Sequence, residues 1–153
     1  MRFHPGSVEG TFVADRGLLG AIRIGRDRLR GLRVEVVIEQ SRAREIRCDD
    51  AAIRAEIEGY LASHAHAARV GMVFVPTNYV VRAESGLDVQ DALLPGLGIS
   101  LGYSDPEHTG APYACPVQLR LLAKKLDVSA GARSLVRGGR FADDLVVGID
   151  PFR

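Results

Sequence analysis

The sequence places histidine, serine and acidic side chains at spacings that deserve a test as chemical sites. His64 and His66 are two residues apart. On a helix, that spacing points two side chains about 200° apart, so both cannot bind one metal ion. His108 lies close in sequence to Asp105 and Glu107, a set that would allow a weak metal contact or a catalytic base. We expect helix-end or surface roles for His64 and His66, and we rank catalysis by His108 below a surface role.

Ser100 is the candidate nucleophile, because Gly-Ile-Ser-Leu-Gly at residues 98–102 imitates the Gly-x-Ser-x-Gly pattern. That pattern needs a strand-to-helix turn, whereas Ser100 falls inside a predicted strand, so we do not assign it a nucleophilic role. Asp143 and Asp144 are adjacent on another predicted strand and would face opposite sides of it. They are therefore expected to be solvent and turn residues.

The two cysteines, Cys48 and Cys115, have neither metal-site spacing nor the density of a disulfide framework. We expect both to be reduced packing residues, with a redox or pairing role as the alternative.

Length and charge narrow the class of protein. The chain has 153 residues, 46% of them apolar, which predicts one domain over residues 1–153 with a core of its own. Its 20 basic and 19 acidic residues give a net charge of +1, so overall charge does not indicate nucleic acid or membrane as a partner. The sequence shows neither a long apolar run nor a signal-peptide pattern, and we expect a cytoplasmic protein.

Many short strands and one long helix are predicted around these residues. Asp49 and Asp50 can cap a helix over residues 51–66, and residues 88–94 can form a second, short helix. Residues 16–20 and 104–116 are predicted loops. The predicted strands cover residues 10–15, 33–40, 44–48, 70–75, 97–103, 117–124, 126–129, 134–136 and 141–148. The expected fold is α+β, with a mainly antiparallel, strongly curved sheet.

Four segments, taken in order, carry a resemblance to a known family. They are Val-Glu-Gly-Thr-Phe-Val-Ala-Asp at residues 8–15, Ala-Arg-Glu-Ile at 43–46, Pro-Thr-Asn at 76–78 and Gly-Leu-Gly-Ile-Ser-Leu-Gly at 96–102. The chain resembles the C-terminal half of the thermophilic-type, leucyl-aminopeptidase-like metallo-aminopeptidases, a fold shared with dihydroxypyridine dioxygenases. It also resembles truncated relatives of this family, the peptide-binding proteins of crocagin biosynthesis, a ribosomal-peptide pathway.

The resemblance implies that the family's metal ligands are lost. Its strand histidine falls on Gly98, and its His-x-Asp pair falls on Gln118 and Arg120. Residues 68–78 hold no carboxylate to replace the family's glutamate, and Arg69 is their one charged side chain. A divalent ion needs imidazole or carboxylate donors, and a guanidinium would repel it. We therefore expect no metal and no other cofactor, with a metal site elsewhere as the alternative.

The expected function is recognition of a ribosomal precursor peptide and its presentation to a modifying enzyme, without catalysis. The resemblance also implies that the family's N-terminal domain is absent, and we expect a homodimer to cover the sheet face thus exposed. The expected peptide contacts are Arg69, Asn78, Gly98, Tyr113, Gln118 and Arg120.

Two other functions stay open. One is a metal-independent cyclase, isomerase or hydrolase acting on a peptide, with His108, Glu84 or Asp105 as its base. The other is a structural subunit that completes a larger enzyme.

Overall fold

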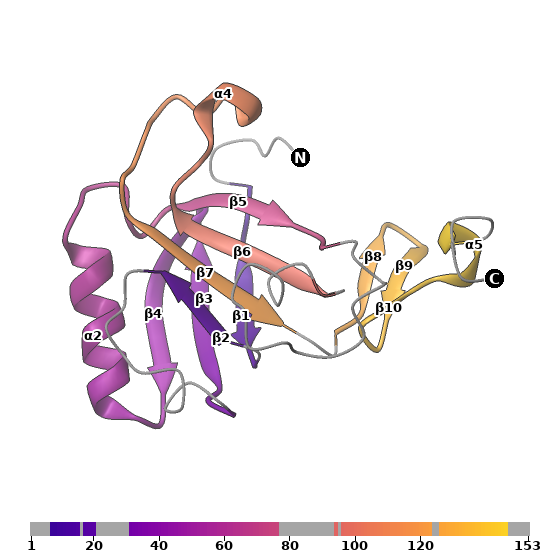
Figure 1. Ribbon diagram of the computed structural model, residues 1–153, viewed down its shortest axis with the longest axis horizontal. Coiled ribbons are helices and arrows are strands. Elements are labelled where there is room, and N and C mark those ends of the chain that lie inside the picture. The colour runs from indigo at the N-terminus through magenta and orange to yellow at the C-terminus, as the bar shows by residue number, and fades with distance from the viewer. Residues whose placement is uncertain are drawn as a thin grey trace. The chain divides into compact units, whose positions relative to one another are not determined.

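The computed structural model describes residues 7–15, 17–20, 31–76, 94, 96–123 and 126–146. The chain divides into two compact units, Met1–Phe74 with Gly98–Ala123, and Val75–Leu97 with Lys124–Arg153 (Figure 1). Each unit is described by itself. The candidate residues that the structure describes, His108 and Ser100 among them, lie in the first unit, apart from Asp143 and Asp144.

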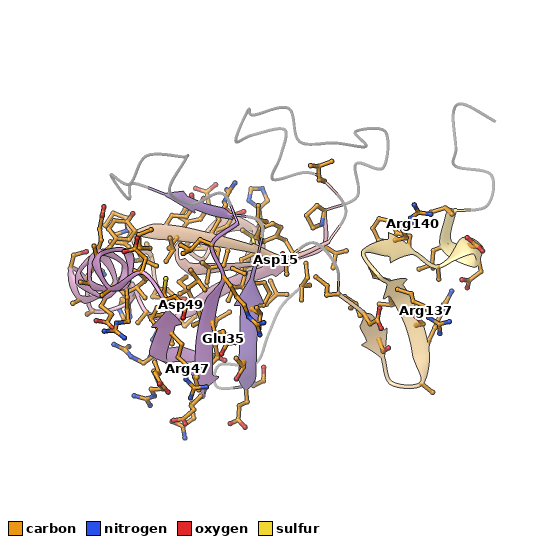
Figure 2. The ribbon with its side chains drawn as sticks, turned by 90° about the horizontal axis from the view of Figure 1, so that it is seen from below. Asp15, Glu35, Arg47, Asp49, Arg137 and Arg140 are labelled. Carbon is orange, nitrogen blue, oxygen red and sulfur yellow. The ribbon has the colours of Figure 1, made fainter. Side chains whose placement is uncertain are left out.

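A three-stranded antiparallel sheet of order β1-β3-β4 opens the first unit. It contains β1 (Gly10–Ala14), β3 (Val34–Glu39) and β4 (Arg42–Cys48). Along β3, Val34, Val36 and Ile38 are buried, as the alternating sequence predicts. Between them, Glu35 carries charge and lies opposite Arg47 in the register, 3.9 Å from its guanidinium (Figure 2). Exposed pairs of this kind add about 0–1 kcal/mol, so the apolar face is what stabilises the sheet.

Helix α2 (Ala51–Ala62) follows β4 and lies beside it (Figure 1). The Asp50 carboxylate accepts hydrogen bonds from the backbone N–H groups of Ala52 (3.0 Å) and Ile53 (3.1 Å), so Asp50 is the N-cap. The helix ends four residues before the predicted His66. At its C-cap, Ser63 donates from both its backbone N–H and its hydroxyl to the Tyr60 carbonyl.

A four-stranded sheet of order β2-β7-β6-β5 completes the first unit. Its strands are β2 (Gly17–Gly20), β5 (Val70–Phe74), β6 (Leu97–Gly102, of which Leu97 falls in the second unit) and β7 (Gln118–Ala123). The prediction of a loop at residues 16–20 is wrong at residues 17–20, because β2 pairs antiparallel with β7, Gly17 opposite Leu122 and Gly20 opposite Leu119. This pairing outweighs the local preference of two glycines for a turn.

One core joins these elements. It takes Ile53, Ile57 and Leu61 from α2 and buried side chains from both sheets. Burying an isoleucine or leucine side chain contributes about 1.5–3 kcal/mol. The sheet contributions are Ala14, Val34, Val36, Ile38, Ile46, Val70, Ile99, Leu101, Leu119 and Leu121.

A short helix, α4 (Pro106–Thr109), interrupts the segment predicted to be a loop at residues 104–116. Pro106 stands at its first turn, where a missing N–H costs nothing. Gly110 ends it in the left-handed conformation, with φ 67°.

The described part of the second unit is a small antiparallel sheet of order β10-β9-β8 with a four-residue helix. The strands are β8 (Val128–Ala130), β9 (Arg133–Arg137) and β10 (Arg140–Phe141), and the helix is α5 (Asp143–Val146). Figure 2 labels Arg137 and Arg140 on this unit. The strand predicted over residues 141–148 is wrong where α5 forms, and Asp144 pairs with Arg133 at 2.9 Å. The Asp143 and Asp144 side chains therefore do not alternate across a strand.

The fold is sheet-rich, and each strand pair whose register is described is antiparallel, as expected for the α+β class. Two details of that expectation are wrong. The described strands form three small sheets instead of one strongly curved sheet, and the described residues contain no long helix, because α2 ends after 12 residues. The short helix predicted over residues 88–94 lies, except for Leu94, outside the described residues. None of the helices in the described ranges is long and apolar enough to span a membrane.

Candidate functional site

The four-stranded sheet has a second face, opposite the core, and it collects several of the predicted site residues. On β6 and β7 the core takes Ile99, Leu101, Leu119 and Leu121. Because strand side chains alternate, the residues between them point to the other face. We call this face the second face. Its described members include Met72 and Phe74 on β5, Gly98 and Ser100 on β6, and Gln118, Arg120 and Leu122 on β7.

Gly98 is covered by the ring of its cross-strand partner, Phe74. A Cβ atom added at Gly98 would lie 2.8 Å from Phe74 Cε1 and closer still to two other ring carbons. Real Cβ atoms do not approach so closely, and a side chain at residue 98 would have to displace the ring. The aromatic ring thus occupies the space in which the resemblance places a metal-binding histidine.

Gln118 and Arg120 form a side-chain pair on the same face. With the amide oxygen of Gln118 turned toward Arg120, that oxygen accepts hydrogen bonds from Nε (3.2 Å) and Nη2 (3.3 Å). Both residues are half-buried. A guanidinium carries five N–H donors and no acceptor, so the pair offers donors to a ligand and does not suit a cation.

Tyr60 fixes the start of β7 beneath this pair. Its hydroxyl donates to the Gln118 carbonyl and accepts from the Gln118 backbone N–H, both at 3.2 Å. These contacts tie α2 to β7 across 58 residues of sequence. Tyr60 was not a predicted site residue, because its helical spacing from Ile53 and Ile57 indicates only a place on the apolar side of α2.

Arg69 and Tyr113 form a separate pair. The Arg69 guanidinium carbon lies 5.4 Å from the centroid of the Tyr113 ring, within the range of a cation–π contact. The backbone of Arg69 is held by Gly102, whose N–H donates to its carbonyl at 2.7 Å, and by a bridge to Arg42. Burial raises the pKa of the Tyr113 phenol, which the positive charge of Arg69 opposes. The Tyr113 side chain therefore stays a neutral O–H near pH 7.

His64 and His66 do not point apart as predicted. Because α2 ends at Ala62, both residues lie in the turns that follow it, and their ring centroids are 5.9 Å apart. The His66 ring also lies 4.8 Å from that of Tyr113. His66 Nδ1 and the Tyr113 hydroxyl oxygen are buried without a hydrogen-bond partner, and each such group costs about 1–3 kcal/mol.

The remaining candidates have local roles. Ser100 is fully buried, and its hydroxyl donates to the Tyr103 carbonyl at 3.3 Å. His108 is exposed and pairs with Asp105 at 2.9 Å. Hydrogen bonding and charge from Asp105 raise the pKa of His108. Asn78 and Glu84 lie outside the described residues.

The described residues contain no group of three or more His, Cys, Asp or Glu side chains able to hold a metal ion. The structure brings Gln118 together with Arg120, and Arg69 together with Tyr113, as two pairs. It places Gly98 on the same face as the first pair. Sequence reasoning missed Phe74, Tyr60 and the contacts of His64 and His66. An aromatic residue opposite a glycine in an antiparallel pair would have pointed to Phe74, once the register was known.

No protein-family model and no curated protein match this chain. Among solved structures, the chain is similar to 2,5-dihydroxypyridine dioxygenase from Pseudomonas putida KT2440, with a TM-score of 0.65 and 18% sequence identity. The match covers 90% of this chain and 41% of the dioxygenase, so the chain spans less than half the length of that protein. At this identity the likeness shows the fold alone. The resemblance to metallo-aminopeptidases and to the crocagin proteins stays a prediction.

Proposed function

We propose that this chain binds an extended segment of a ribosomal precursor peptide on the second face and presents it to a modifying enzyme, without catalysing a reaction itself. The observation that carries the proposal is the donor set of that face. Where the resemblance expects imidazole and carboxylate, the chain has a guanidinium hydrogen-bonded to an amide, beside a glycine covered by an aromatic ring. Such groups suit the carboxylates and carbonyls of a peptide.

The shape of the sheet supports the same proposal. β5 is the last strand in the order β2-β7-β6-β5, and end strands can pair with an extended peptide through backbone hydrogen bonds. The half-buried side chains of Met72 and Phe74 on β5 would supply apolar contacts on the same face as Arg120. Arg69 with Tyr113 is then a second contact point for the peptide.

A metal-independent cyclase or hydrolase at this face is the weaker candidate. Such an enzyme needs a base within reach of the substrate, and the described members of the second face include no histidine, aspartate or glutamate. His108 and Asp105 lie instead at α4, bonded to each other.

Calorimetric titration tests the proposal. The metal-stripped protein is titrated with precursor peptides encoded near its gene, and separately with zinc and with iron(II). We expect saturable peptide binding and unchanged peptide mass after incubation. A stoichiometric metal, or turnover of the peptide by the pure protein, would instead make the chain an enzyme.

The homodimer and the cytoplasmic location belong to the same proposal. A dimer would cover apolar surface on the sheet. Light scattering after gel filtration measures the mass in solution, and a monomer across the accessible concentration range would remove the dimer from the proposal.

A further inference from the structure

We propose that Cys115 and His64 form a nucleophile–base pair that accepts an acyl group from a thioester or activated ester. This activity lies outside the proposed peptide binding and does not depend on it. The Cys115 Sγ atom lies 3.4 Å from His64 Nδ1, although the two residues are 51 apart in sequence. Thiol nucleophiles of enzymes are activated by a base at this kind of distance.

The protonation of His64 follows from a second contact. The backbone N–H of His66 donates to the same His64 Nδ1 atom, at 3.2 Å. A nitrogen that accepts a hydrogen bond carries a lone pair, so the proton of the neutral ring is on Nε2. The thiol of Cys115 is then a second donor to the same Nδ1 lone pair, and transfer of its proton to Nδ1 requires the His66 N–H to leave that atom.

The surroundings leave polar groups for an incoming carbonyl. Tyr113 packs against the small cluster formed by Ala67, Cys115 and Val117. Its hydroxyl oxygen and His66 Nδ1 are buried and have no hydrogen-bond partner. An O–H donor without an acceptor, on a side chain that packs against the cluster of Cys115, is suited to the negative charge that develops on a carbonyl oxygen under attack.

Residues next to Cys115 and His64 in the chain are exposed to solvent. Cys115 is itself 4% exposed, but both of its chain neighbours, Ala114 and Pro116, are exposed. His64 is half-buried and is followed by the exposed Ala65.

The step balances without an oxidant or a reductant. Sγ attacks the carbonyl carbon while the thiol proton passes to His64 Nδ1. The bond from carbonyl carbon to leaving group then breaks, and the proton passes from His64 to the leaving thiolate or alkoxide. The products are S-acyl Cys115 and the free thiol or alcohol.

Site-resolved alkylation compares Cys115 with Cys48, which is half-buried and serves as the internal reference. The native protein is treated with iodoacetamide, and labelling of each cysteine is followed by peptide mass spectrometry. We expect Cys115 to react faster than Cys48 despite its greater burial. Cys115 labelling no faster than Cys48 at every pH would mark it as an inert packing residue and overturn the proposal.

Two variants and an acyl donor complete the test. His64→Gln should slow Cys115 labelling by about tenfold or more and leave Cys48 unchanged, whereas His108→Gln, a distant exposed histidine, should leave both rates unchanged. If His64→Gln fails to fold, the ratio of the Cys115 and Cys48 labelling rates in the wild-type protein still decides. With p-nitrophenyl acetate, we expect one equivalent of p-nitrophenolate and an acetyl group on Cys115, both lost in Cys115→Ser. Acetylation of lysines alone would refute acyl transfer at this pair.

Discussion

The ring of Phe74 lies against the backbone of Gly98, its partner across the β5–β6 pair. Gly98 is thus a packing requirement of this sheet as well as the position onto which the resemblance would place a metal-binding histidine. Any side chain at residue 98 competes with an aromatic ring for the same space.

Gly98→Ala should therefore destabilise the protein by about 1–3 kcal/mol, the cost of overpacking a filled site. Urea unfolding measures the free energy of unfolding. Gly59→Ala is the matched control, because Gly59 is in α2 with nothing within 4 Å of an added Cβ atom. That change should raise stability by about 0.5–1 kcal/mol. If Gly98→Ala is neutral, the ring moves aside freely and does not bar a ligand side chain.

A double-mutant cycle tests whether a side chain at residue 98 and the Phe74 ring compete for the same space. Combining Gly98→Ala with Phe74→Leu removes the ring atoms that clash, so the double variant should be more stable than the sum of the two single changes predicts, by at least about 1 kcal/mol. Additive changes would mean that Phe74 and Gly98 do not compete.

Tyr60→Phe should lower the free energy of unfolding by about 1–3 kcal/mol. The substitution removes the hydroxyl that accepts a hydrogen bond from the backbone N–H of Gln118 at the start of β7. Urea unfolding is again the measurement. Tyr103→Phe is the control, because Tyr103 is 37% exposed and water can hydrate its hydroxyl. Equal effects of the two changes would show that the Tyr60 bridge contributes nothing specific.

The local patterns of the sequence account for the elements that depend on local chemistry. The alternation of Val34, Val36 and Ile38 predicted β3, and the carboxylate of Asp50 predicted the start of α2. The pairing of β2 with β7 depends on residues about a hundred positions away, which no local pattern contains.

The same limit applies to the site. The spacing of two residues was enough to place Gln118 and Arg120 on one face of a strand. His64 and His66 were misplaced because the end of α2 at Ala62 is set by capping at Ser63 and not by a glycine or proline. Contacts such as Cys115 with His64 arise only when distant segments fold together.

His108 should titrate above the ordinary histidine value, because hydrogen bonding and charge from Asp105 raise its pKa. A raised pKa in the folded state means that the pair stabilises the fold fully below about pH 6.5. That contribution is lost as the pH rises through the folded-state pKa. Proton NMR of the His108 ring gives the titration directly, and Asp105→Asn should return it to the ordinary range. Because His108 is exposed, added salt should shrink the shift.

Arg120→Ala tests the role of the second face in peptide binding. If the guanidinium bonds to a carboxylate or carbonyl of the peptide, its loss should weaken binding by about 1.5–3 kcal/mol, which is about tenfold to a hundredfold in Kd. The peptide affinity of Arg120→Lys should lie between that of the wild-type protein and that of Arg120→Ala. Lysine keeps the positive charge but lacks the planar guanidinium that also bonds to Gln118. Calorimetric titration of each variant with the same precursor peptide gives the comparison.

Arg137→Ala is the matched control for this series, since Arg137 is an exposed arginine on β9 of the second unit. It removes the same charge from the chain, so any general effect of net charge on an acidic peptide appears in both variants. Weaker binding in Arg120→Ala alone places the contact on the second face. If both variants bind the peptide equally more weakly, Arg120 acts only through long-range charge attraction. If neither variant changes the affinity, the peptide does not contact Arg120, and the pair formed by Arg69 and Tyr113 becomes the contact to test.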